Sequence, residues 1–478
     1  MSKLKKALPL LATSLLLLTS CGTNGDGDKR ILKIEFVKGG FGLTPYEKLA
    51  EAFMEEHKDV KVKLIPNREM ASTTATKLEQ SSNLSDIMIY NRTIGNIYDW
   101  STKGYIYDLS DLMKEEVENG ETLLDRLDDN AKKSSEYRGS YWSIPEYYNI
   151  NGFVYNSTLF EAKKWNLPKT TKELKDLCET IDNTKLGGNS IKPLVYCGNG
   201  ADGYLYYGID GWMTSFEGIT NMDNFYEFDS PEVYAPSVSK GKLKGMTLLK
   251  EIFFDSDYCC ENSMIMNATE GQSKLLTYEA AMMLNGSWFE NEMKPYMNAS
   301  SPTFKMFAVP EISDDSNNVL HNDGYKTNDK NEQVVTADFV GNCFIPSAAS
   351  NISDAKEFLK FMSRKSSCEL YTKYSNAVRP LKYDYSSSNN AYKDMSGFGK
   401  SVLDIASNYC LYVPNSKANV AVANKATLYP QGGYWYKRMY SNPDKYTPSF
   451  CIDSDYKYAK DSWSRWIEES AYLGEIDG

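Results

Sequence analysis

Aromatic and planar polar side chains occur together at places where predicted strands end. Tyr90, Asn91 and Arg92 close one apolar run, while Trp288 and Glu290 follow another apolar run and an Asn-Gly turn. An aromatic ring can stack on a flat apolar face, and carboxylate, amide or guanidinium groups can pair with hydroxyls at a rim. These residue types therefore suit noncovalent binding of a polar ring-shaped molecule.

The sequence offers few residues for histidine-based catalysis or for metal binding. His57 and His321 are the only histidines, and they are far apart in the sequence. Neither lies at a metal-ligand spacing or in the pattern of a histidine-based catalytic triad. We expect no metal and no cofactor.

Two local patterns resemble ligand motifs without completing them. Gly198-x-Gly200-x-x-Gly203 follows a predicted strand, as a dinucleotide fingerprint does, but no clear second strand ends in an acid about 20 residues later. We interpret it as a loop that lines a cleft. The polar stretch 322–333 has spaced oxygens but lacks a glycine and a final bidentate glutamate at EF-hand spacing, so we predict a solvated loop.

The composition is that of a globular, acidic protein. Hydrophobic residues make up 41% of the chain and charged residues 24%, and the net charge is −11. Removal of residues 1–20, which hold three lysines and no acid, would leave −14. A surface with this balance argues against nucleic acid as a partner.

The N-terminus has the pattern of a secretion signal. Lysines at positions 3, 5 and 6 precede an apolar run over 7–18 that is shorter than the roughly 20 residues needed to span a bilayer. Residues 18–21, Leu-Thr-Ser-Cys, resemble the lipobox of bacterial lipoproteins, which are cut before the cysteine and acylated on it. We therefore predict a signal peptide over 1–20, a lipidated Cys21 and a flexible leash to residue 30.

This prediction places the protein at the cell membrane, lipid-anchored on the extracytoplasmic face and touching the membrane through the anchor only. The alternative is an ordinary cleavage site with a chance cysteine. Eight cysteines follow Cys21, an even number in an oxidising location. Disulfides are therefore possible, but their pairing cannot be read from the sequence.

The rest of the chain alternates between strand and helix patterns. Its first part reads as strand, helix, strand, helix, strand and helix, over 31–37, from Thr44, over 60–64, 72–80, 86–90 and near 94–103. A capping box at Thr170 and Glu173 opens a later helix that precedes a strand over 191–197. Such a rhythm builds parallel sheets, whose ligands collect at the carboxyl ends of the strands.

Five segments, in order, resemble the extracellular solute-binding protein family 1, the carbohydrate-binding components of ABC importers. They are "YEKLAEAFMEEHKDVKVKLI", "DIMIYNRTIGNIYDWSTKGYIYDLSDLM", "YWSIPEYYNINGFVYNSTLFEAKKWNLPKTTKELKDLCETI", "YEAAMMLNGSWFENEMK" and "FIPSAASNISDAKEFLKFMSRKSSCELYTKYSNAVRP". Together they cover most of residues 31–380. The tail from Leu381 matches poorly, and the stretch 310–333 has no clear counterpart.

The resemblance implies an α/β, two-lobe fold like that of periplasmic binding proteins. Each lobe would be a mostly parallel sheet flanked by helices, with a cleft between the lobes, and the chain would cross near Ile144, Val309 and Tyr374. We expect an N-lobe of 31–144 plus about 310–373 and a C-lobe of 145–309 plus about 374–478. A sugar in the cleft would close the lobes, and the closed form would dock on a permease.

A pyranose has flat C–H faces and a rim of hydroxyls, so its site needs aromatic rings and planar polar groups. The family commonly stacks sugar on the tryptophan that Trp288 matches. Glu290 is either a capping partner of Ser287 or a ligand contact. The other candidates at positions expected to face the cleft are Phe41, Tyr90, Asn91, Arg92, Glu146, Tyr147, Tyr148, Asp338, Asn342, Tyr434 and Trp435.

These observations predict a monomeric binding protein, not an enzyme, that delivers a neutral oligosaccharide to the permease subunits of an ABC importer. One alternative is a surface glycoside hydrolase, which needs two carboxylates about 5 to 10 Å apart; Glu146 and Glu290 would be the pair. The other alternative is a lipoprotein that uses the same clamp to sense sugar. The sequence does not name the sugar, its linkage or its length.

Overall fold

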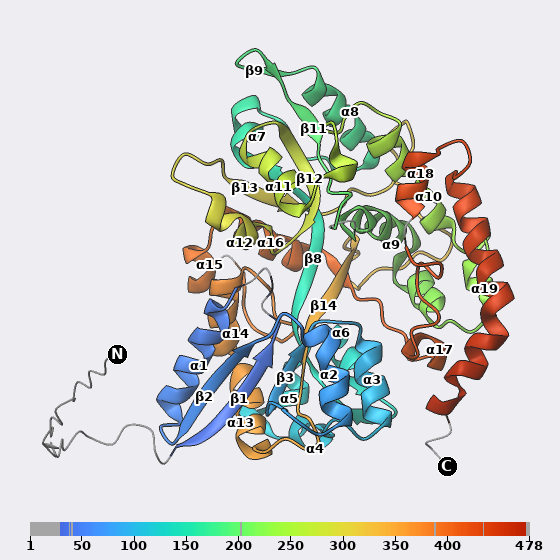
Figure 1. The fold of residues 1–478 in the computed structure, drawn as a ribbon. Coiled ribbons are helices and arrows are strands. Elements are labelled where there is room, and N and C mark those ends of the chain that lie inside the picture. Colours follow the sequence, from blue (N-terminus) through green and yellow to red (C-terminus); the bar gives the residue numbers. More distant parts are fainter. Residues whose placement is uncertain are drawn as a thin grey trace, which may run out of the picture.

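The computed structural model describes residues 29–37, 39, 42–200, 203–386, 389–433 and 435–474 (Figure 1). The predicted signal peptide, Cys21, Phe41 and Tyr434 lie outside these residues, so their roles stay predictions. Two bodies, lower and upper in Figure 1, are joined by the long strands β8 and β14.

The lower body begins with the predicted alternation of strands and helices. Its first elements are β1 (Arg30–Phe36), α1 (Thr44–Glu56), β2 (Val60–Pro66), α2 (Met70–Glu79), β3 (Ile87–Tyr90) and α3 (Ile94–Thr102). β1 pairs in parallel with both β2 and β3, which confirms the β-α-β-α-β prediction. The apolar face of α1, including Leu49 and Phe53, is buried in the core that contains β1 and β2.

Further short elements complete the lower body. They are α4 (Ser110–Met113), β4 (Glu116–Glu118), β5 (Glu121–Thr122), α5 (Leu123–Arg126), α6 (Asp129–Ser135), β6 (Glu136–Tyr137), β7 (Ser140–Tyr141), α13 (Ile352–Met362) and α14 (Lys365–Ser375). Helices α13 and α14 contribute to the same core as α1, although they lie some 300 residues later in the chain. The lower body is therefore built from chain segments on both sides of the upper one.

β8 (Ile144–Asn156) and β14 (Val334–Phe344) pair antiparallel and pass through both bodies. The main sheet has the order β11-β12-β8-β14-β3-β1-β2, with β13 (Phe304–Phe307) paired to β8 and β15 (Cys410–Tyr412) paired to β14. The upper part is mixed: β11 (Lys192–Leu194) is parallel to β12 (Ala280–Gly286), but β12 and β13 are antiparallel to β8. The two bodies thus share one continuous mixed sheet, whereas the resemblance implied a separate, mostly parallel sheet in each lobe.

Helices surround the upper part of the sheet. The upper elements are α7 (Ser157–Lys163), α8 (Thr171–Asp182), β9 (Lys185–Leu186), β10 (Asn189–Ser190), α9 (Gly203–Tyr226), η1 (Pro231–Tyr234), α10 (Lys240–Leu249), η2 (Lys250–Phe254), η3 (Ser263–Ile265), α11 (Ala268–Leu276), α12 (Phe289–Met293) and η4 (Lys294–Tyr296). Thr170 caps α8 by accepting from the Glu173 N–H, as predicted. By contrast, Thr44 lies inside α1, whose N-cap is Leu43.

The C-terminal tail runs along both bodies. Its elements are α15 (Asn390–Asp394), α16 (Gly397–Asn408), α17 (Asn419–Val422), α18 (Trp435–Ser441), α19 (Pro448–Ser470) and η5 (Ala471–Leu473). The long helix α19 packs on α10 in the upper body. At its far end, Leu473 is buried beside Tyr98 and Tyr137 of the lower body, and its carbonyl accepts from Arg138.

The polar stretch before β14 packs on the upper body. The Glu311 N–H donates to the Lys169 carbonyl, and the Ile219 N–H donates to the Lys326 carbonyl. α9 kinks there at Gly218 (φ 71°), where a Cβ would lie 2.6 Å from the Lys326 carbonyl oxygen. The lobe boundaries stay a prediction, and these contacts favour a boundary at β14 rather than near residue 310.

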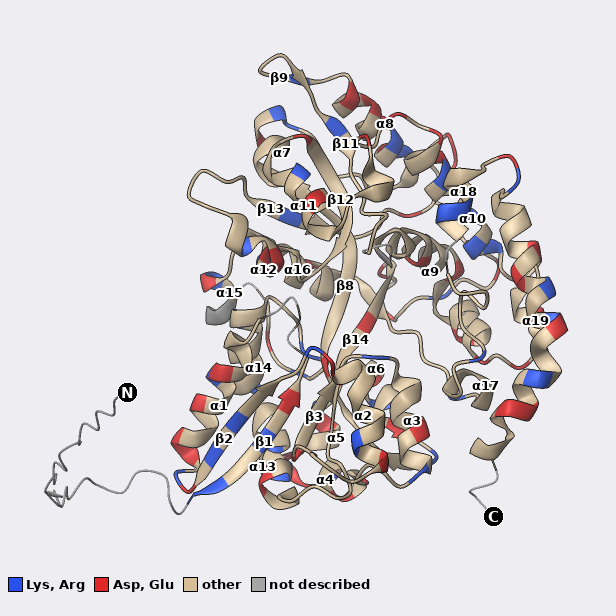
Figure 2. Cartoon of the chain, in the orientation of Figure 1, with Lys and Arg blue, Asp and Glu red and all other residues tan. Residues whose placement is uncertain are grey.

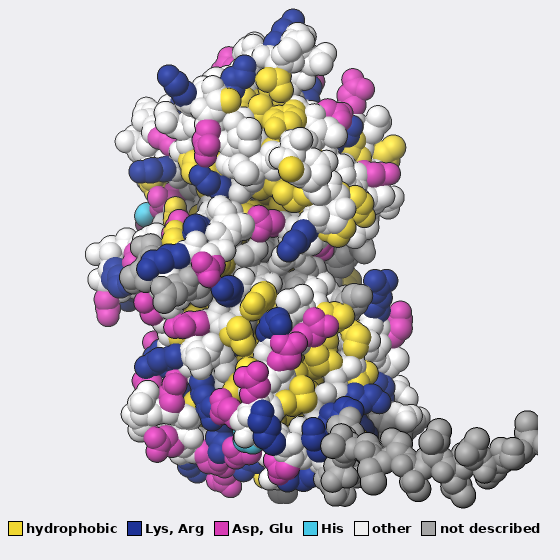
Figure 3. Space-filling view, turned by 90° about the vertical axis from the view of Figure 1, so that its left-hand side faces the viewer, with side chains coloured by type: hydrophobic (Ala, Val, Ile, Leu, Met, Phe, Trp, Pro, Cys, Tyr) yellow, Lys and Arg dark blue, Asp and Glu magenta, His cyan; other side chains and the backbone are white. Residues whose placement is uncertain are grey.

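The described residues can be checked for disulfides and for membrane-spanning helices. The eight cysteines from Cys178 to Cys451 are free thiols. No helix in the described ranges is long and apolar enough to cross a membrane. On the face shown in Figure 3, basic and acidic side chains are interspersed among hydrophobic ones.

A buried ion pair fixes α19 to the upper body. Lys242 of α10 and Asp455 of α19 lie 2.7 Å apart, and each is only 1% exposed. The ammonium also donates to the Leu428 carbonyl, and the carboxylate also accepts from the Trp435 indole. Because both charges are desolvated, each depends on the other.

Asp455→Ala would leave the Lys242 ammonium buried without its counter-charge. We expect the free energy of unfolding to fall by about 3–5 kcal/mol, measured by urea denaturation. Asp453→Ala, at an exposed position of the same helix, is the matched control and should stay within about 0.5 kcal/mol of the parent. Equal urea midpoints for the two variants would contradict a stabilising role for this pair.

Candidate ligand-binding cleft

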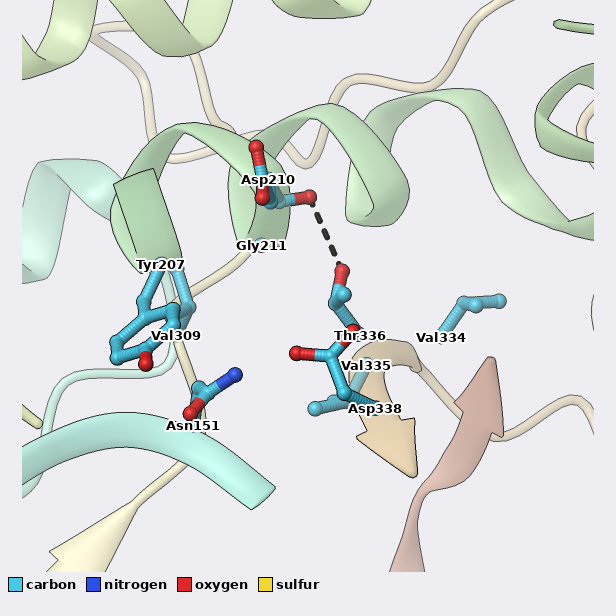
Figure 4. Close-up of a pocket in the computed structure, with 9 residues that line it drawn as sticks. All are labelled: Asn151, Tyr207, Asp210, Gly211, Val309, Val334, Val335, Thr336 and Asp338. Carbon is cyan, nitrogen blue, oxygen red and sulfur yellow. Dashed lines mark hydrogen bonds between the residues drawn. The ribbon is translucent and has the colours of Figure 1, made fainter. Parts of the chain in front are cut away.

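A polar cavity lies between α9 and one face of the β8–β14 pair (Figure 4). The register places Asp338 opposite Asn149, and side chains two residues apart share a face of the sheet. Thr336, Asp338 and Asn151 therefore line the same wall, while Tyr207 and Asp210 line the opposite one from α9. In Figure 4, the Asn151 and Asp338 side chains face each other across the space below α9.

The cavity continues into a wider one toward the C-terminal tail. The first part has a volume of only about 10 Å³, which is room for about one water molecule. The second part has a volume of about 250 Å³, close to the lower end of the range for ligand pockets. Both parts share Asp210, Thr336 and Asp338, and the second adds Thr214, Met222, Tyr226, Pro414, Thr427, Leu428 and Tyr429.

Burial shifts the titration of both carboxyl groups in this cavity. Desolvation raises the pKa of Asp210 to about 7, helped by the nearby charge of Asp338 and opposed by Tyr429, whose hydroxyl donates to the carboxylate at 2.5 Å, and by Lys242. Desolvation likewise raises the pKa of Asp338 to about 6, against hydrogen bonds from Asn151 and Asn149. Neither carboxylate has a cationic partner in contact.

Two amide oxygens next to Asp338 are unused. Asn149 and Asn151 are each 4% exposed, and their Oδ1 atoms have no hydrogen-bond partner. A buried acceptor without a donor costs free energy, so such atoms in a native protein need an explanation. A ligand that donates hydrogen bonds would provide one.

Trp288 stands beside this cavity. Its indole donates to the Tyr204 hydroxyl at 3.2 Å, and its ring centroid lies 5.8 Å from that of Tyr204 and 6.0 Å from that of Tyr207. The half-buried ring also covers Gly286, where any Cβ would collide with it. Trp288 itself is the N-cap residue of α12, so the predicted cap at Ser287 was wrong.

Other predicted residues gather at the ends of β1 and β3, apart from this cavity. Asn91, Glu146 and Tyr147 line a separate small cavity with Tyr46 and Gly341. Glu146 is fully buried there, and desolvation raises its pKa to about 7 despite the charge of Arg379. Gly39 and Gly42 also line this cavity, and Phe41 lies outside the described residues.

Tyr90 and Arg92 line a third hollow. The Tyr90 ring is largely buried against Trp100, whereas Arg92 is exposed. On β14, Asn342 lies opposite Tyr90 and is buried, with an unpartnered Oδ1. These residues do not reach the cavity under α9.

The remaining predicted residues face elsewhere. Tyr148 lies on the other face of β8, and its hydroxyl donates to Asp128 at 2.6 Å. Trp435 is buried in the upper core with its indole bonded to Asp455, which removes it from the candidate site. Glu290 lines a groove on another side, where Asn376 and Ser396 donate to its carboxylate.

Of the predicted site residues that the structure describes, only Asp338 lines the cavity, and Trp288 borders it through Tyr207. Sequence reasoning missed Tyr204, Tyr207 and Asp210, although the aromatic segment "YLYYGID" directly follows the glycine-rich loop. It also missed Asn149 and Asn151. The strict alternation in "YYNIN" could have identified them, because it separates Tyr148 from the two asparagines.

Comparison with known proteins identifies a family. A family model described as bacterial extracellular solute-binding protein matches residues 48–396, which is more than two thirds of the chain. No protein in the curated collection of sequences matches.

Solved structures share the fold at low sequence identity. RafE in complex with raffinose is 16% identical with a TM-score of 0.61 and covers 90% of this chain and 100% of its own. A chitin oligosaccharide binding protein is 17% identical with a TM-score of 0.64 and covers 91% and 99%. Maltose-bound T. maritima MalE3 is 15% identical with a TM-score of 0.63 and covers 90% and 99%. The two-lobe α/β prediction is thereby confirmed.

The raised pKa of Asp338 makes stability depend on pH. The folded protein holds the Asp338 proton more tightly than the unfolded chain does, because the pKa is about 6 when folded and 3.8 when unfolded. The resulting stabilisation is fully present below pH 3.8 and is lost as the pH rises through 6. Asp338→Asn removes the charge. We expect the variant to be more stable than the parent by about 1–3 kcal/mol at pH 8, with the difference vanishing toward pH 4, by urea denaturation. Asp229→Asn, at an exposed site, should show no such trend.

Proposed function

The chain belongs to the bacterial extracellular solute-binding proteins, and from this premise we propose that it captures an oligosaccharide and delivers it to the permease subunits of an ABC importer. The observation that carries the sugar proposal is the ring group Trp288, Tyr204 and Tyr207 beside a cavity of amide and carboxyl acceptors. Rings can stack on sugar faces, and the acceptors can take hydroxyl protons. That some neighbours in fold were solved with raffinose or maltose supports the same ligand class.

The charge of the sugar is a separate question. The sequence predicts a neutral ligand, but Asp210 and Asp338 place two carboxyl groups in one cavity. We therefore propose an oligosaccharide without the restriction to a neutral one.

Delivery requires the lobes to close on the ligand. We propose that β8 and β14 act as the hinge, because they are shared by both bodies and carry Asn149, Asn151 and Asp338 on the face toward α9. Closure follows only if the sugar binds the closed form more tightly than the open one. Ring contacts from the upper body, made together with contacts from the lower one, would supply that difference.

Hydrolysis is the second candidate function. The family and its neighbours in fold are binding proteins. Glu146 and Glu290, the pair expected from the sequence, line separate cavities. Asp210 and Asp338 do share a cavity, with pKa values of about 7 and 6. A glycosidase needs two carboxyl groups close together, so a test for hydrolysis would examine this pair.

The binding proposal is tested by calorimetry with a panel of oligosaccharides, followed by analysis of the recovered sugar. We expect unaltered sugar and a weakening of binding by about 1–3 kcal/mol in Trp288→Ala, because a stacking surface is lost. Tyr296→Ala, at a side chain 58% exposed in η4, is the control that should bind like the parent. Shorter products would establish hydrolysis, and unchanged affinity in Trp288→Ala would remove this ring from the site.

Anchoring through Cys21 is proposed from the sequence alone, since this residue lies outside the described ranges. We expect Cys21→Ser to abolish labelling with radioactive palmitate and to shift the protein from the membrane fraction to the medium or periplasm. A lysine-to-serine change in the predicted leash, Lys29→Ser, serves as control. Retained palmitate in Cys21→Ser would contradict the lipoprotein proposal. A sensing role would share this anchor and site, and a pull-down with the permease separates it from transport.

A further inference from the structure

We propose that the ligand carries a basic nitrogen, as an amino sugar does, and that this nitrogen enters the cavity between α9, β14 and the segment 427–429, here named the acidic cavity. The inference rests on the proposed function, because it describes which sugar the same cleft takes. The acidic cavity is lined by Asn151, Tyr207, Asp210, Thr214, Tyr226, Thr336, Asp338 and Tyr429 together with apolar side chains.

The first argument is the excess of hydrogen-bond acceptors. The Tyr429 hydroxyl already donates to Asp210, and the Thr336 hydroxyl already lies within hydrogen-bond distance of Thr214 Oγ1 and the Asp210 carbonyl. What stays open is the second oxygen of Asp210 and the unpartnered Oδ1 of Asn151, which is 96% buried, while the Asp338 carboxylate accepts from the Asn149 and Asn151 amides but has no charged donor. A sugar hydroxyl brings an acceptor with each donor, whereas an ammonium group brings donors only.

The second argument is the missing counter-charge. Among the described residues that line the acidic cavity there are two aspartates and no lysine or arginine. Figure 2 shows acidic segments on both α9 and β14. Lys242, the cation whose charge acts on Asp210, is already bound to Asp455 and the Leu428 carbonyl. A cationic ligand would supply the positive charge that these two carboxylates lack inside the cavity.

The third argument is the aromatic lining. Tyr226 and Tyr429 line the wider part of the acidic cavity, and Tyr207 separates it from Trp288. The faces of aromatic rings attract cations within about 6 Å. Since the Lys242 ammonium already lies 4.8 Å from the centroid of the Tyr429 ring, Tyr226 and Tyr207 are the rings left for a ligand cation. Rings and carboxylates together thus favour an ammonium over a neutral hydroxyl, while Trp288 and Tyr204 stay free to stack on the sugar ring.

The test is a calorimetric panel at pH 7 in which each oligosaccharide backbone occurs in three forms, with a free amine, an N-acetyl group or a hydroxyl at the same carbon. We expect the tightest binder to carry the free amine and to bind at least about tenfold more tightly than its acetylated and hydroxyl forms. Asp338→Asn and Asp210→Asn should each remove most of this preference, and Asp229→Asn, exposed after α9, should preserve it. A tightest binder without a basic nitrogen would overturn the inference and leave the proposed function intact.

The same experiment separates the two proposals if no oligosaccharide binds. The proposed function then fails, and titration with putrescine, a simple diamine, decides the inference. Putrescine binding that is lost in Asp338→Asn would support a basic ligand of another class. No binding of putrescine would overturn the inference as well.

Discussion

The antiparallel pairing of β8 with β14 is the constraint on which both the fold and the candidate site depend. Each strand is long enough to serve both bodies, so the sheet is continuous from β11 to β2. The pairing register decides which side chains face α9, since neighbours along a strand point to opposite faces. A slip of one residue would turn Asn149, Asn151 and Asp338 toward the core and bring Tyr148 and Phe339 into the cavity.

The cleft face of these strands is polar at a cost to stability. Buried acceptors without donors and ionised carboxylates without cations are unfavourable, and the surrounding apolar clusters must offset them. Unpaired buried acceptors and carboxylates of this kind are expected where a bound ligand supplies the missing donors. The Lys242–Asp455 pair shows the contrast, because there both charges and their remaining bonds are satisfied within the chain.

The sequence predicted the first strands and helices well, because their apolar periodicity and turn residues are local signals. It also predicted the two-lobe fold, through resemblance. The site was harder, since proximity to a predicted strand end does not say which way a side chain points. Glu146 and Tyr147 lie on the same strand as Asn149 and Asn151 but line another cavity, and Trp435 is held in the core by Asp455. Asp210 was missed because a lone acid in an aromatic helix carries no pattern of its own.

Helix α19 is held at two distant points, through Asp455 on the upper body and through the residues after Ser470 on the lower one. A rigid helix attached at both ends resists any motion that changes the distance between its two attachments. Relative rotation of the two bodies would therefore occur about axes that pass close to α19. If the two bodies rotate as proposed, the side of the molecule along α19 would move least, and the cleft would open on the opposite side.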